Sequence, residues 1–481
     1  MLFNSLQFAI FFPVVFALYW SLPEKFRVYI ILVSSYYFYM SWNAKYVVLI
    51  LFTTIVSYFA AIMLEKFRLA RKLILVITLL SCLGVLFVFK YFNFISETLV
   101  NFLNMFASIK LHPVTLKLLL PVGISFYTFQ TLSYVIDVYK GQEKAEKNFA
   151  AYAAFISFFP QLVAGPIERT KNLLPQIKGS HVFKYEQGVY GLKLILWGLF
   201  KKMAVADYLA VWVDKIFANV EAYRGFVLII AVCFFAVQIY CDFSGYTDIA
   251  RGCAKLMGIE LMVNFRSPYF ASSIREYWQR WHISLSTWFR DYVYIPLGGS
   301  RVSKIKHYRN IMIVFMTSGF WHGANWTYII WGMLHGIASI IEKLLSRRDK
   351  NYRPKGLEWA VKVLITFTFC VFSRIFYRAA NLQESLYICR HLFDGITSIK
   401  SYLYNGIRDL KSIQGETKFA AIFIITLAVW DYISLETDII SWTSKLGTFK
   451  RWALYAVLTF LAIISIFSGA RNPAEFIYFQ F

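Results

Sequence analysis

Long apolar runs make up most of the chain, and short polar segments rich in Lys and Arg separate them. A helix needs about 20 mostly apolar residues to cross the hydrocarbon core of a bilayer. The pattern therefore predicts an all-α polytopic membrane protein with about 11 transmembrane helices. Runs of sufficient length lie near residues 4–20, 26–43, 45–64, 72–90, 116–136, 187–211, 226–243, 310–341, 357–377, 418–434 and 452–469.

The basic segments also predict an orientation. Segment 65–72 follows the third run and segment 137–148 follows the fifth, and both are rich in Lys and Arg. Cytoplasmic loops carry this excess of positive charge. We therefore expect the N-terminus to lie outside the cytoplasm. Because the first run has no basic segment before it and no small-residue cleavage site, we expect it to be a retained span rather than a signal peptide.

Two apolar stretches carry helix-breaking residues. Residues 149–168 contain Pro160 and Pro166 and have basic residues on both sides, which favours a re-entrant segment entering and leaving on the cytoplasmic side. Irregular backbone at membrane depth is tolerated only where it is buried in protein or lines a cavity. The 310–341 run is long enough for a broken pair of helices, with the break expected just after His322 at Gly323, Ala324 and Asn325.

Composition agrees with the hydropathy pattern. The 481 residues are 58% hydrophobic and 16% charged, whereas soluble domains are about 25% charged. We expect a single membrane-embedded domain over 1–481. Most of the formal charge of +23 is explained by loop topology and contact with lipid headgroups rather than by nucleic-acid binding, and the rest could bind an anionic substrate. The six cysteines have neither disulfide-framework nor zinc spacing, so we predict no metal site.

Residues 264–309 are the least membrane-like part of the centre. Ser273 and Glu276 have capping-box spacing, and an apolar stripe on one helix follows: Ile274, Trp278, Trp281, Leu285 and Trp288. A polar stripe contains Arg275, Gln279, His282, Ser286 and Arg290. One interpretation is a continuous amphipathic helix in the membrane interface, anchored by its tryptophans. The other is that His282, at mid-stripe, is a functional residue.

His322 and His335 lie in the apolar stretch GFWHGANWTYIIWGMLHG. They are 13 residues apart, about 220° around a continuous helix, which does not match a two-histidine metal face. Ionisable residues inside membrane segments usually face the bundle interior and are functional. A buried neutral imidazole can remove the proton of an attacking hydroxyl. The alternative is that these histidines are hydrogen-bonded structural residues.

Other polar groups offer weaker candidates. The Asp242–Asp248 segment could orient a histidine or form a polar hinge. A covalent mechanism using Ser318 or Ser284 is conceivable, but the chain has no GxSxG nucleophile elbow. Neither GxxxxGK[ST] nor GxGxxG occurs, so nucleotide hydrolysis and a Rossmann site have no support.

Several motifs together resemble the membrane-bound O-acyltransferase family, in particular its alginate O-acetylation type. They are NSLQFAIFFPVVFALYW at the start, SFFPQLVAGPIER at 157–169, DFSGYTDIARGCAKLMGI at 242–259, NFRSPYFASSIREYWQRWHISLSTWFRDYVYIPLGGSR at 264–301, SGFWHGANWTYIIWGMLHG at 318–336 and FIYFQF at the end. The resemblance covers nearly the whole chain, with a motif core over about 120–345. It implies a helical bundle around a central tunnel that joins a cytoplasmic acyl thioester to an acceptor hydroxyl outside.

The resemblance also implies roles for single residues. His322 matches the family's catalytic histidine and His282 its second essential histidine, while His335, Asn325 and Trp321 are supporting candidates. Acetyl-CoA is the expected donor, and Arg280, Arg290 and Arg301 are candidates for binding it. The expected partner is an extracellular polysaccharide such as alginate, or an extracytoplasmic acetyltransferase that passes the acetyl group on. A bacterial inner-membrane location is implied.

Two rival functions stay open at this point. One is D-alanyl transfer to teichoic acid from a carrier protein, against which the PLGG sequence and the basic segments argue. The other is a proton-coupled transporter or flippase. Paired intramembrane carboxylates or two similar halves of the chain would favour this function, and neither is visible in the sequence.

Overall fold

The computed structural model describes residues 1–106, 110–345, 354–414, 417–467 and 476–477. Within these ranges the chain forms helices and no β-strand, which confirms the all-α prediction. By length and composition, five helical segments among the described residues can cross a membrane, or six if the bent pair α19 (Ile399–Ile413) and α20 (Thr417–Ile433) is one span. The predicted number of about 11 spans is not confirmed by this count. The five segments are Glu24–Lys66, Arg71–Asn104, Phe226–Leu256, Trp326–Leu345 and Gly356–Arg378.

The chain divides into two compact units, so the expectation of a single domain stays a prediction. The first unit comprises residues 1–192 and 250–262, and the second comprises 193–249 and 263–481. Each unit is built from its own set of packed helices. The long helix α12 (Phe226–Leu256) and helix α10 (Tyr185–Leu199) each contribute residues to both.

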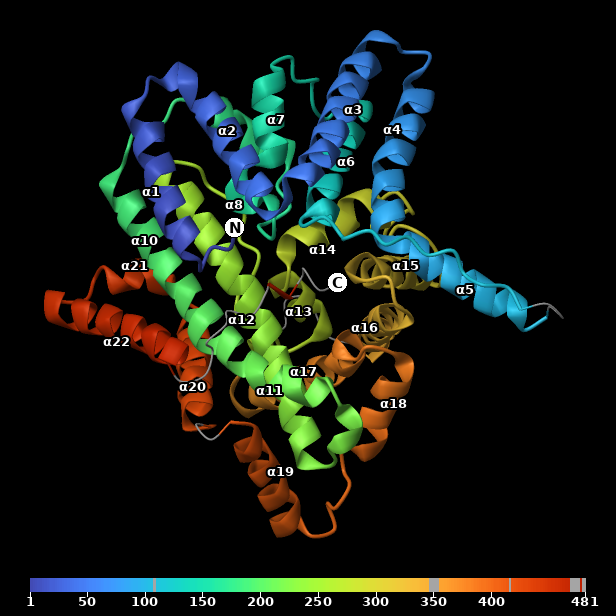
Figure 1. Ribbon diagram of the computed structural model, residues 1–481, viewed down its shortest axis with the longest axis vertical. Helices are drawn as coiled ribbons and strands as arrows, with labels where there is room; N and C mark the ends of the chain where they lie inside the picture. The colour runs from blue at the N-terminus through green and yellow to red at the C-terminus, as the bar shows by residue number, and fades with distance from the viewer. Residues whose placement is uncertain (107–109, 346–353, 415–416, 468–475, 478–481) are drawn as a thin grey trace. The chain divides into compact units, whose positions relative to one another are not determined.

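In the first unit, α3, α4 and α6 lie side by side (Figure 1). Several hydroxyls of these helices bond the backbone of the preceding turn, as in Thr54, Thr78 and Ser57. The Ser57 hydroxyl also contacts the Tyr152 hydroxyl at 2.6 Å. The elements of this unit are α1 (Leu6–Ser21), α2 (Glu24–Asn43), η1 (Ala44–Tyr46), α3 (Val47–Lys66), α4 (Arg71–Leu86), η2 (Phe87–Tyr91), α5 (Phe92–Asn104), α6 (Ile124–Tyr139), α7 (Phe149–Ser157), α8 (Phe159–Leu162) and α9 (Thr170–Lys178).

The predicted break within 149–168 is present between α7 and α8. Phe158 leaves the helical conformation, with φ −46° and ψ 106°, and Pro160 lies in the first turn of α8. Gln130 and Gln161 both donate to the Phe155 carbonyl, at 2.8 and 3.0 Å, so they bond a carbonyl near the end of α7. The segment is buried within its unit, as irregular backbone at membrane depth requires. Re-entry on the cytoplasmic side stays a prediction.

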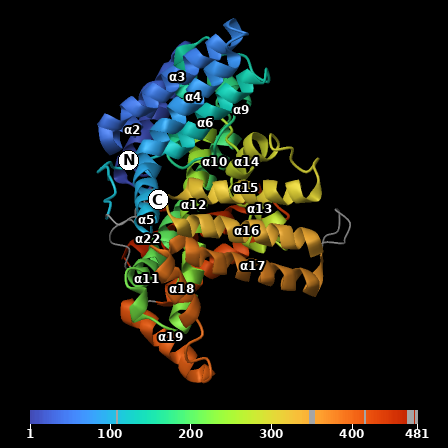
Figure 2. The same cartoon turned by 90° about the vertical axis from the view of Figure 1, so that its right-hand side faces the viewer.

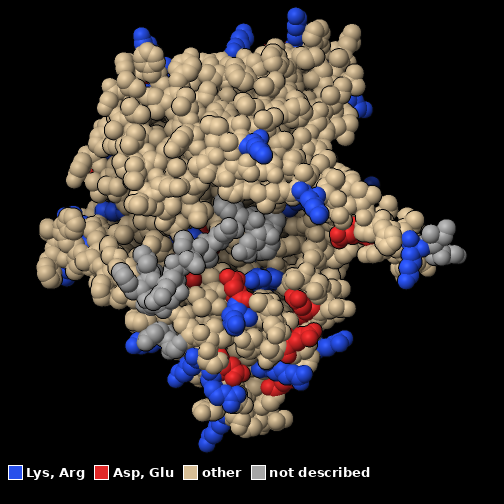
Figure 3. Space-filling model, in the orientation of Figure 1, with Lys and Arg blue, Asp and Glu red and all other residues tan. Residues whose placement is uncertain are grey.

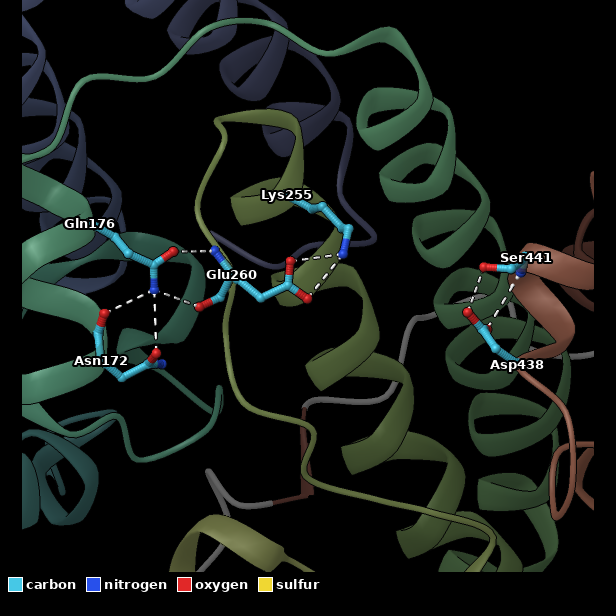
Figure 4. Close-up of polar contacts among 6 residues, drawn as sticks. All are labelled: Asn172, Gln176, Lys255, Glu260, Asp438 and Ser441. Carbon is cyan, nitrogen blue, oxygen red and sulfur yellow. Dashed lines mark hydrogen bonds and ion pairs between the residues drawn. The ribbon is translucent and has the colours of Figure 1, made fainter.

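Side chains of α9 hold the segment that follows α12 (Figure 4). Gln176 accepts from the Glu260 backbone N–H at 2.8 Å and donates to its carbonyl at 3.0 Å. The buried Glu168 accepts from the Met262 backbone N–H at 2.6 Å. These bonds satisfy the backbone of a segment that has no regular secondary structure.

The second unit contains the central polar region. In it, α15, α16 and α17 lie side by side (Figure 2). Asp438 caps α21, with its side chain bonded to Ser441 (Figure 4). The further elements are η3 (Phe200–Asp207), α11 (Tyr208–Phe217), η4 (Val220–Ala222), η5 (Pro268–Phe270), α13 (Ile274–Arg280), α14 (Ile283–Phe289), η6 (Arg290–Tyr294), α15 (Lys304–His322), α16 (Trp326–Leu345), α17 (Gly356–Arg378), α18 (Leu382–His391), α19 (Ile399–Ile413), α20 (Thr417–Ile433), α21 (Ile439–Thr443) and α22 (Thr448–Phe467).

Charge is unevenly spread over the second unit. Acidic and basic side chains gather on the visible surface where α18 and α19 lie (Figure 3). Charged side chains are costly in hydrocarbon. This part of the unit is therefore suited to contact water or lipid headgroups rather than lipid tails.

The expected continuous helix after Ser273 is wrong. Ser273 caps α13 as predicted, accepting from the Glu276 backbone N–H at 3.1 Å. The helix then ends at Arg280, and a second helix starts at Ile283. His282, between them, adopts a left-handed backbone with φ 44° and ψ 55°. This conformation is uncommon for any residue other than glycine and is concentrated at functional sites.

The interfacial interpretation of this region is also wrong. Trp281 is 1% exposed, Trp288 is 6% exposed and His282 is fully buried. These side chains pack inside the second unit and do not form a lipid-facing row of anchors. The two stripes of the sequence pattern do not exist as surfaces, because the chain changes direction at His282.

Candidate functional site

His322 is the last residue of α15, at the break that the sequence predicts. Gly323 leaves the helix with an extended backbone, and α16 starts at Trp326. Asn325 shapes this turn: its side-chain oxygen accepts from the Thr327 backbone N–H at 3.0 Å, and its nitrogen donates to the Ala380 carbonyl at 2.8 Å. In this structure Asn325 therefore stabilises the start of α16.

Glycines bring α15 and α16 into close contact beside His322. A Cβ atom at Gly319 would lie 2.2 Å from the Tyr328 carbonyl oxygen, and one at Gly332 would lie 2.3 Å from the Phe315 carbonyl oxygen. Only glycine allows this approach of the two backbones. The close packing fixes the position of the α15 C-terminus, which carries His322.

The His322 imidazole has a defined neighbour on α17. Its Nδ1 lies 3.2 Å from the Tyr377 hydroxyl, and the side chain is 2% exposed. A neutral imidazole carries one N–H and one acceptor nitrogen. If Nδ1 donates its proton to the Tyr377 oxygen, Nε2 is the basic nitrogen, which is the tautomer that a general base requires.

His282 occupies a fully buried site beside Asn264. Its Nδ1 lies 3.2 Å from Asn264 Oδ1, which also accepts from the backbone N–H and the hydroxyl of Ser284, at 3.1 and 2.9 Å. Burial lowers the pKa of His282 from 6.5 to about 3, because the charged form loses its hydration. His282 is therefore neutral at physiological pH. The Ser284 hydroxyl is committed to Asn264, which argues against Ser284 as a nucleophile.

Tryptophans connect the three histidines into a histidine cluster, formed by His282, His322, His335, Trp321 and Trp331. The Trp321 ring contacts both His282 and His322, with centroids 6.2 and 5.0 Å apart. The Trp331 ring contacts His322 at 5.2 Å and His335 at 5.0 Å. The structure thus brings together the three histidines and the supporting residue Trp321.

Two residues that the sequence analysis missed, Arg374 and Tyr377, contact the histidine cluster. Tyr377 bonds His322, and Arg374, 1% exposed, lies 4.5 Å from the Trp281 ring centroid and 5.6 Å from that of Trp331. Arg374 also donates to the Tyr277 hydroxyl at 2.8 Å. An arginine inside the apolar run 357–377 was a signal that could have been used. Tyr377 had no such signal among 32 tyrosines.

The arginines proposed for donor binding lie outside the histidine cluster. Arg280 pairs with Glu276 at 2.6 Å and Arg290 with Asp291 at 2.8 Å. Arg301 is exposed in the turn before α15. The Arg290 side chain is 59% exposed, so Arg290 and Arg301 face solvent.

Asp242 has neither of its two predicted roles. α12 continues unbroken from Phe226 to Leu256, so no hinge exists at this position. Asp242 instead binds Lys202 at 2.7 Å and accepts from the Ile477 backbone N–H at 2.7 Å. Lys202 is shared with Asp207 at 2.8 Å. Asp242 is thus an ionic partner of the buried Lys202 and a hydrogen-bond acceptor for the Ile477 backbone.

The same contact brings the end of the described chain near His282. Phe476 is fully buried and packs on Phe243, with ring centroids 6.0 Å apart. Phe243 in turn contacts the His282 ring at 4.7 Å. Across the ranges that the structure describes, no group of three or more His, Cys, Asp or Glu side chains is arranged as metal ligands.

The family model and the similar proteins agree on one family for this chain. The membrane-bound O-acyltransferase family matches residues 146–378, which include the histidine cluster, Arg374 and Tyr377. The chain is 40% identical over 389 residues to a probable alginate O-acetylase of Pseudomonas aeruginosa, covering 80% of this chain and 73% of the relative. It is 37% identical over 391 residues to the peptidoglycan O-acetyltransferase of Helicobacter pylori, covering 75% and 72%.

A more distant relative has a different substrate in its name. The chain is 30% identical over 274 residues to the teichoic acid D-alanyltransferase of Bacillus subtilis, covering 52% of this chain and 67% of the relative. The helical architecture with its apolar spans and the matches at up to 40% identity agree. The chain is an integral membrane protein that belongs to the membrane-bound O-acyltransferase family, and it is an O-acyltransferase.

Proposed function

We propose that this enzyme moves an acetyl group from acetyl-CoA in the cytoplasm across the bacterial inner membrane for O-acetylation of an extracellular polysaccharide, with His322 as the general base. The observation that carries the proposal is the His322 site: a buried imidazole at a helix end, bonded through Nδ1 to Tyr377. The relatives named for alginate and peptidoglycan O-acetylation support a polysaccharide acceptor.

The proposed chemistry follows from the tautomer. Nδ1 of His322 donates its proton to the Tyr377 oxygen, so Nε2 accepts the proton of the acceptor hydroxyl. As that proton leaves, the hydroxyl oxygen forms a bond to the thioester carbonyl carbon. The carbon–sulfur bond then breaks, and the imidazolium returns the proton to the thiolate. General base catalysis of this kind contributes about 10²–10⁴-fold.

The other residues have positioning roles in this proposal. His282 is neutral and contacts Trp321, which in turn contacts His322. It thereby orients the thioester or the acceptor beside the base. Arg290 and Arg301 stay candidates for the phosphates of coenzyme A because their side chains are exposed, and guanidinium groups suit phosphate. His335 supports the cluster through Trp331.

The location and topology are part of the same proposal. The basic loops predict an N-terminus outside the cytoplasm, and the donor thioester is made inside the cell. The acetyl group reaches the polysaccharide directly or through an extracytoplasmic partner acetyltransferase. Membrane lipids surround the apolar spans.

D-alanyl transfer from a carrier protein is the second candidate within the same chemistry. The observation that favours it is the 30% identity to the teichoic acid enzyme. That match covers 52% of this chain, against 80% for the alginate O-acetylase. The wider coverage and higher identity favour acetyl transfer. A proton-coupled transporter gains no support from the family.

Reconstitution distinguishes these functions. Purified protein in nanodiscs receives radiolabelled acetyl-CoA, or a D-alanyl carrier protein, together with alginate or peptidoglycan fragments. We expect turnover of acetyl-CoA and label in a polysaccharide, without a proton gradient. Turnover of the carrier-bound D-alanyl thioester alone would assign the second function. Consumption of neither donor, in protein that remains folded, would refute the proposal.

A further inference from the structure

Three aromatic rings beside His322 form a closed triangle, the Trp278–Trp331–His335 triad. The centroid distances are 5.8 Å between the indoles, 5.1 Å from Trp278 to His335 and 5.0 Å from Trp331 to His335. Trp331 and His335 lie one turn apart on α16, and Trp278 comes from α13. Trp331 is fully buried and His335 is 1% exposed.

Each ring of the triad carries a buried nitrogen that needs a hydrogen bond. Among the residues that the structure describes, Trp278 Nε1, Trp331 Nε1 and His335 Nδ1 have no hydrogen-bond partner. Buried polar atoms in folded proteins are bonded in the great majority of cases, to protein, water or ligand. Because the three rings contact one another, we infer one shared hydrogen-bond partner for the three nitrogens rather than three separately unbonded atoms.

The Ser373 hydroxyl determines whether His335 Nδ1 is a donor or an acceptor, and so which kind of partner fits the triad. The Ser373 hydroxyl donates to the Cys370 carbonyl at 2.8 Å, so its one proton is used. His335 Nε2 lies 3.0 Å from the same oxygen and must therefore donate to it. In a neutral imidazole this leaves Nδ1 as an acceptor. The triad thus offers two indole N–H donors and one acceptor.

Two donors and one acceptor are the complement of a single O–H group, which accepts through its lone pairs and donates its proton. A carbonyl or carboxylate would satisfy the indoles but would leave His335 Nδ1 without a donor. We propose that the Trp278–Trp331–His335 triad binds one hydroxyl oxygen, from the acceptor substrate or from a water molecule. The acceptor source rests on the proposed function, whereas the water source does not.

The position of the triad suits an acceptor hydroxyl. Trp331 contacts the His322 ring at 5.2 Å on one side and His335 at 5.0 Å on the other. The Trp331 ring therefore separates a hydroxyl held at the triad from the proposed base, so this hydroxyl is a neighbour of the acceptor hydroxyl that His322 deprotonates and is not that hydroxyl itself. In this arrangement Trp278 is a binding residue for the acceptor, and Ser373 is a positioning residue that fixes the tautomer of His335.

Indole N–H signals test the proposal without any activity measurement. Protein labelled with ¹⁵N-tryptophan in nanodiscs gives one indole signal per tryptophan, and Trp278→Phe and Trp331→Phe assign the two that matter. We expect both signals at the downfield positions of hydrogen-bonded indoles. Both signals at the upfield positions of unbonded indoles would overturn the proposal, whether or not the protein transfers acetyl groups.

Kinetics of Trp278→Phe then separate the two sources. If the bound hydroxyl belongs to the acceptor, we expect Trp278→Phe to raise the KM for the acceptor several-fold. For a bound water, the KM for the acceptor stays at the wild-type value although the indoles are bonded. Trp212→Phe is the matched control, because Trp212 is a fully buried tryptophan whose indole donates to the Leu410 carbonyl at 3.0 Å. Ser373→Ala should also raise the KM for the acceptor, because the His335 proton is then no longer held on Nε2 by the Ser373 oxygen.

Discussion

Gly319→Ala should inactivate the enzyme by moving His322 rather than by removing a catalytic group. A Cβ atom at residue 319 would lie 2.2 Å from the Tyr328 carbonyl oxygen, whereas ordinary contact starts at 3.4 Å. The obstacle is backbone, so α15 and α16 must separate locally by about 1.2 Å, the difference of these two distances. His322 lies one turn further along the same helix. A misplacement of about 1 Å can cost about 10²-fold in rate.

Gly336→Ala is the matched control on the same pair of helices. Its Cβ would lie 2.7 Å from the Met312 sulfur, which belongs to a flexible side chain that can move aside. Both substitutions raise helix propensity by about 1 kcal/mol, so the difference between them isolates the backbone contact. The assay is turnover of radiolabelled acetyl-CoA in nanodiscs, with thermal unfolding as a check on folding.

We expect Gly319→Ala to lose about 10²-fold in turnover and to unfold at a lower temperature, because overpacking costs about 1–3 kcal/mol. We expect Gly336→Ala to stay close to wild type. Wild-type turnover and Tm in Gly319→Ala would refute the reasoning. An equal loss in both variants would show that any added methyl group, not the contact with Tyr328, is responsible.

Three further predictions concern buried polar groups. Tyr377→Phe removes a neutral hydrogen bond worth about 1 kcal/mol, so we expect kcat to fall about fivefold at an unchanged KM for acetyl-CoA; an unchanged kcat would contradict a role in setting the His322 tautomer. His282→Gln should flatten the dependence of Tm on pH. The folded protein resists protonation of His282 down to a pKa of about 3, whereas the unfolded chain protonates near 6.5. The stability contribution is therefore complete above pH 6.5 and falls by up to about 1.4 kcal/mol per unit as the pH drops below it; equal slopes in both proteins would refute this. Asp242→Ala removes one partner of the buried Lys202, and breaking a buried ion pair costs about 3–5 kcal/mol, so Tm should fall markedly; an unchanged Tm would mean that Asp207 alone stabilises the lysine.

The sequence predicted those features that depend on local chemistry. The helical class follows from the apolar runs. The break after His322 follows from Gly323 and Asn325, which favour a turn, and the break near Pro160 follows from a missing backbone donor. The N-cap at Ser273 follows from Glu276, which lies three residues further along the chain. In each case the signal lies within a few residues of the feature.

The features that the sequence did not predict depend on contacts between distant segments. Where the helix after Ser273 breaks, Asn264, 18 residues before His282, bonds the His282 ring and the Ser284 backbone N–H. Asp242 is held by Lys202, on a π-helix elsewhere in the same unit. Periodicity cannot report such contacts, and it places His282 on a polar stripe although the side chain is fully buried.

Among the site residues, His322 and His335 stood out because ionisable groups are rare in apolar runs, and His282 stood out by its place in the middle of a polar stripe. Tyr377 and Trp278 did not, because aromatic residues make up 19% of the chain. Tyr377 matters because its hydroxyl bonds His322, and Trp278 because its ring contacts His335. Only the packing of α13, α16 and α17 reveals that.

Acyl transfer by His322→Ala tests the central claim most directly. Purified wild-type and variant proteins in nanodiscs receive radiolabelled acetyl-CoA and the acceptor found for the wild type, and a thermal unfolding scan shows that both are folded. If His322 is the general base, turnover in the variant falls by about 10²-fold or more while the KM for acetyl-CoA stays near the wild-type value. If folded His322→Ala retains turnover within a few-fold of wild type, His322 is not the base.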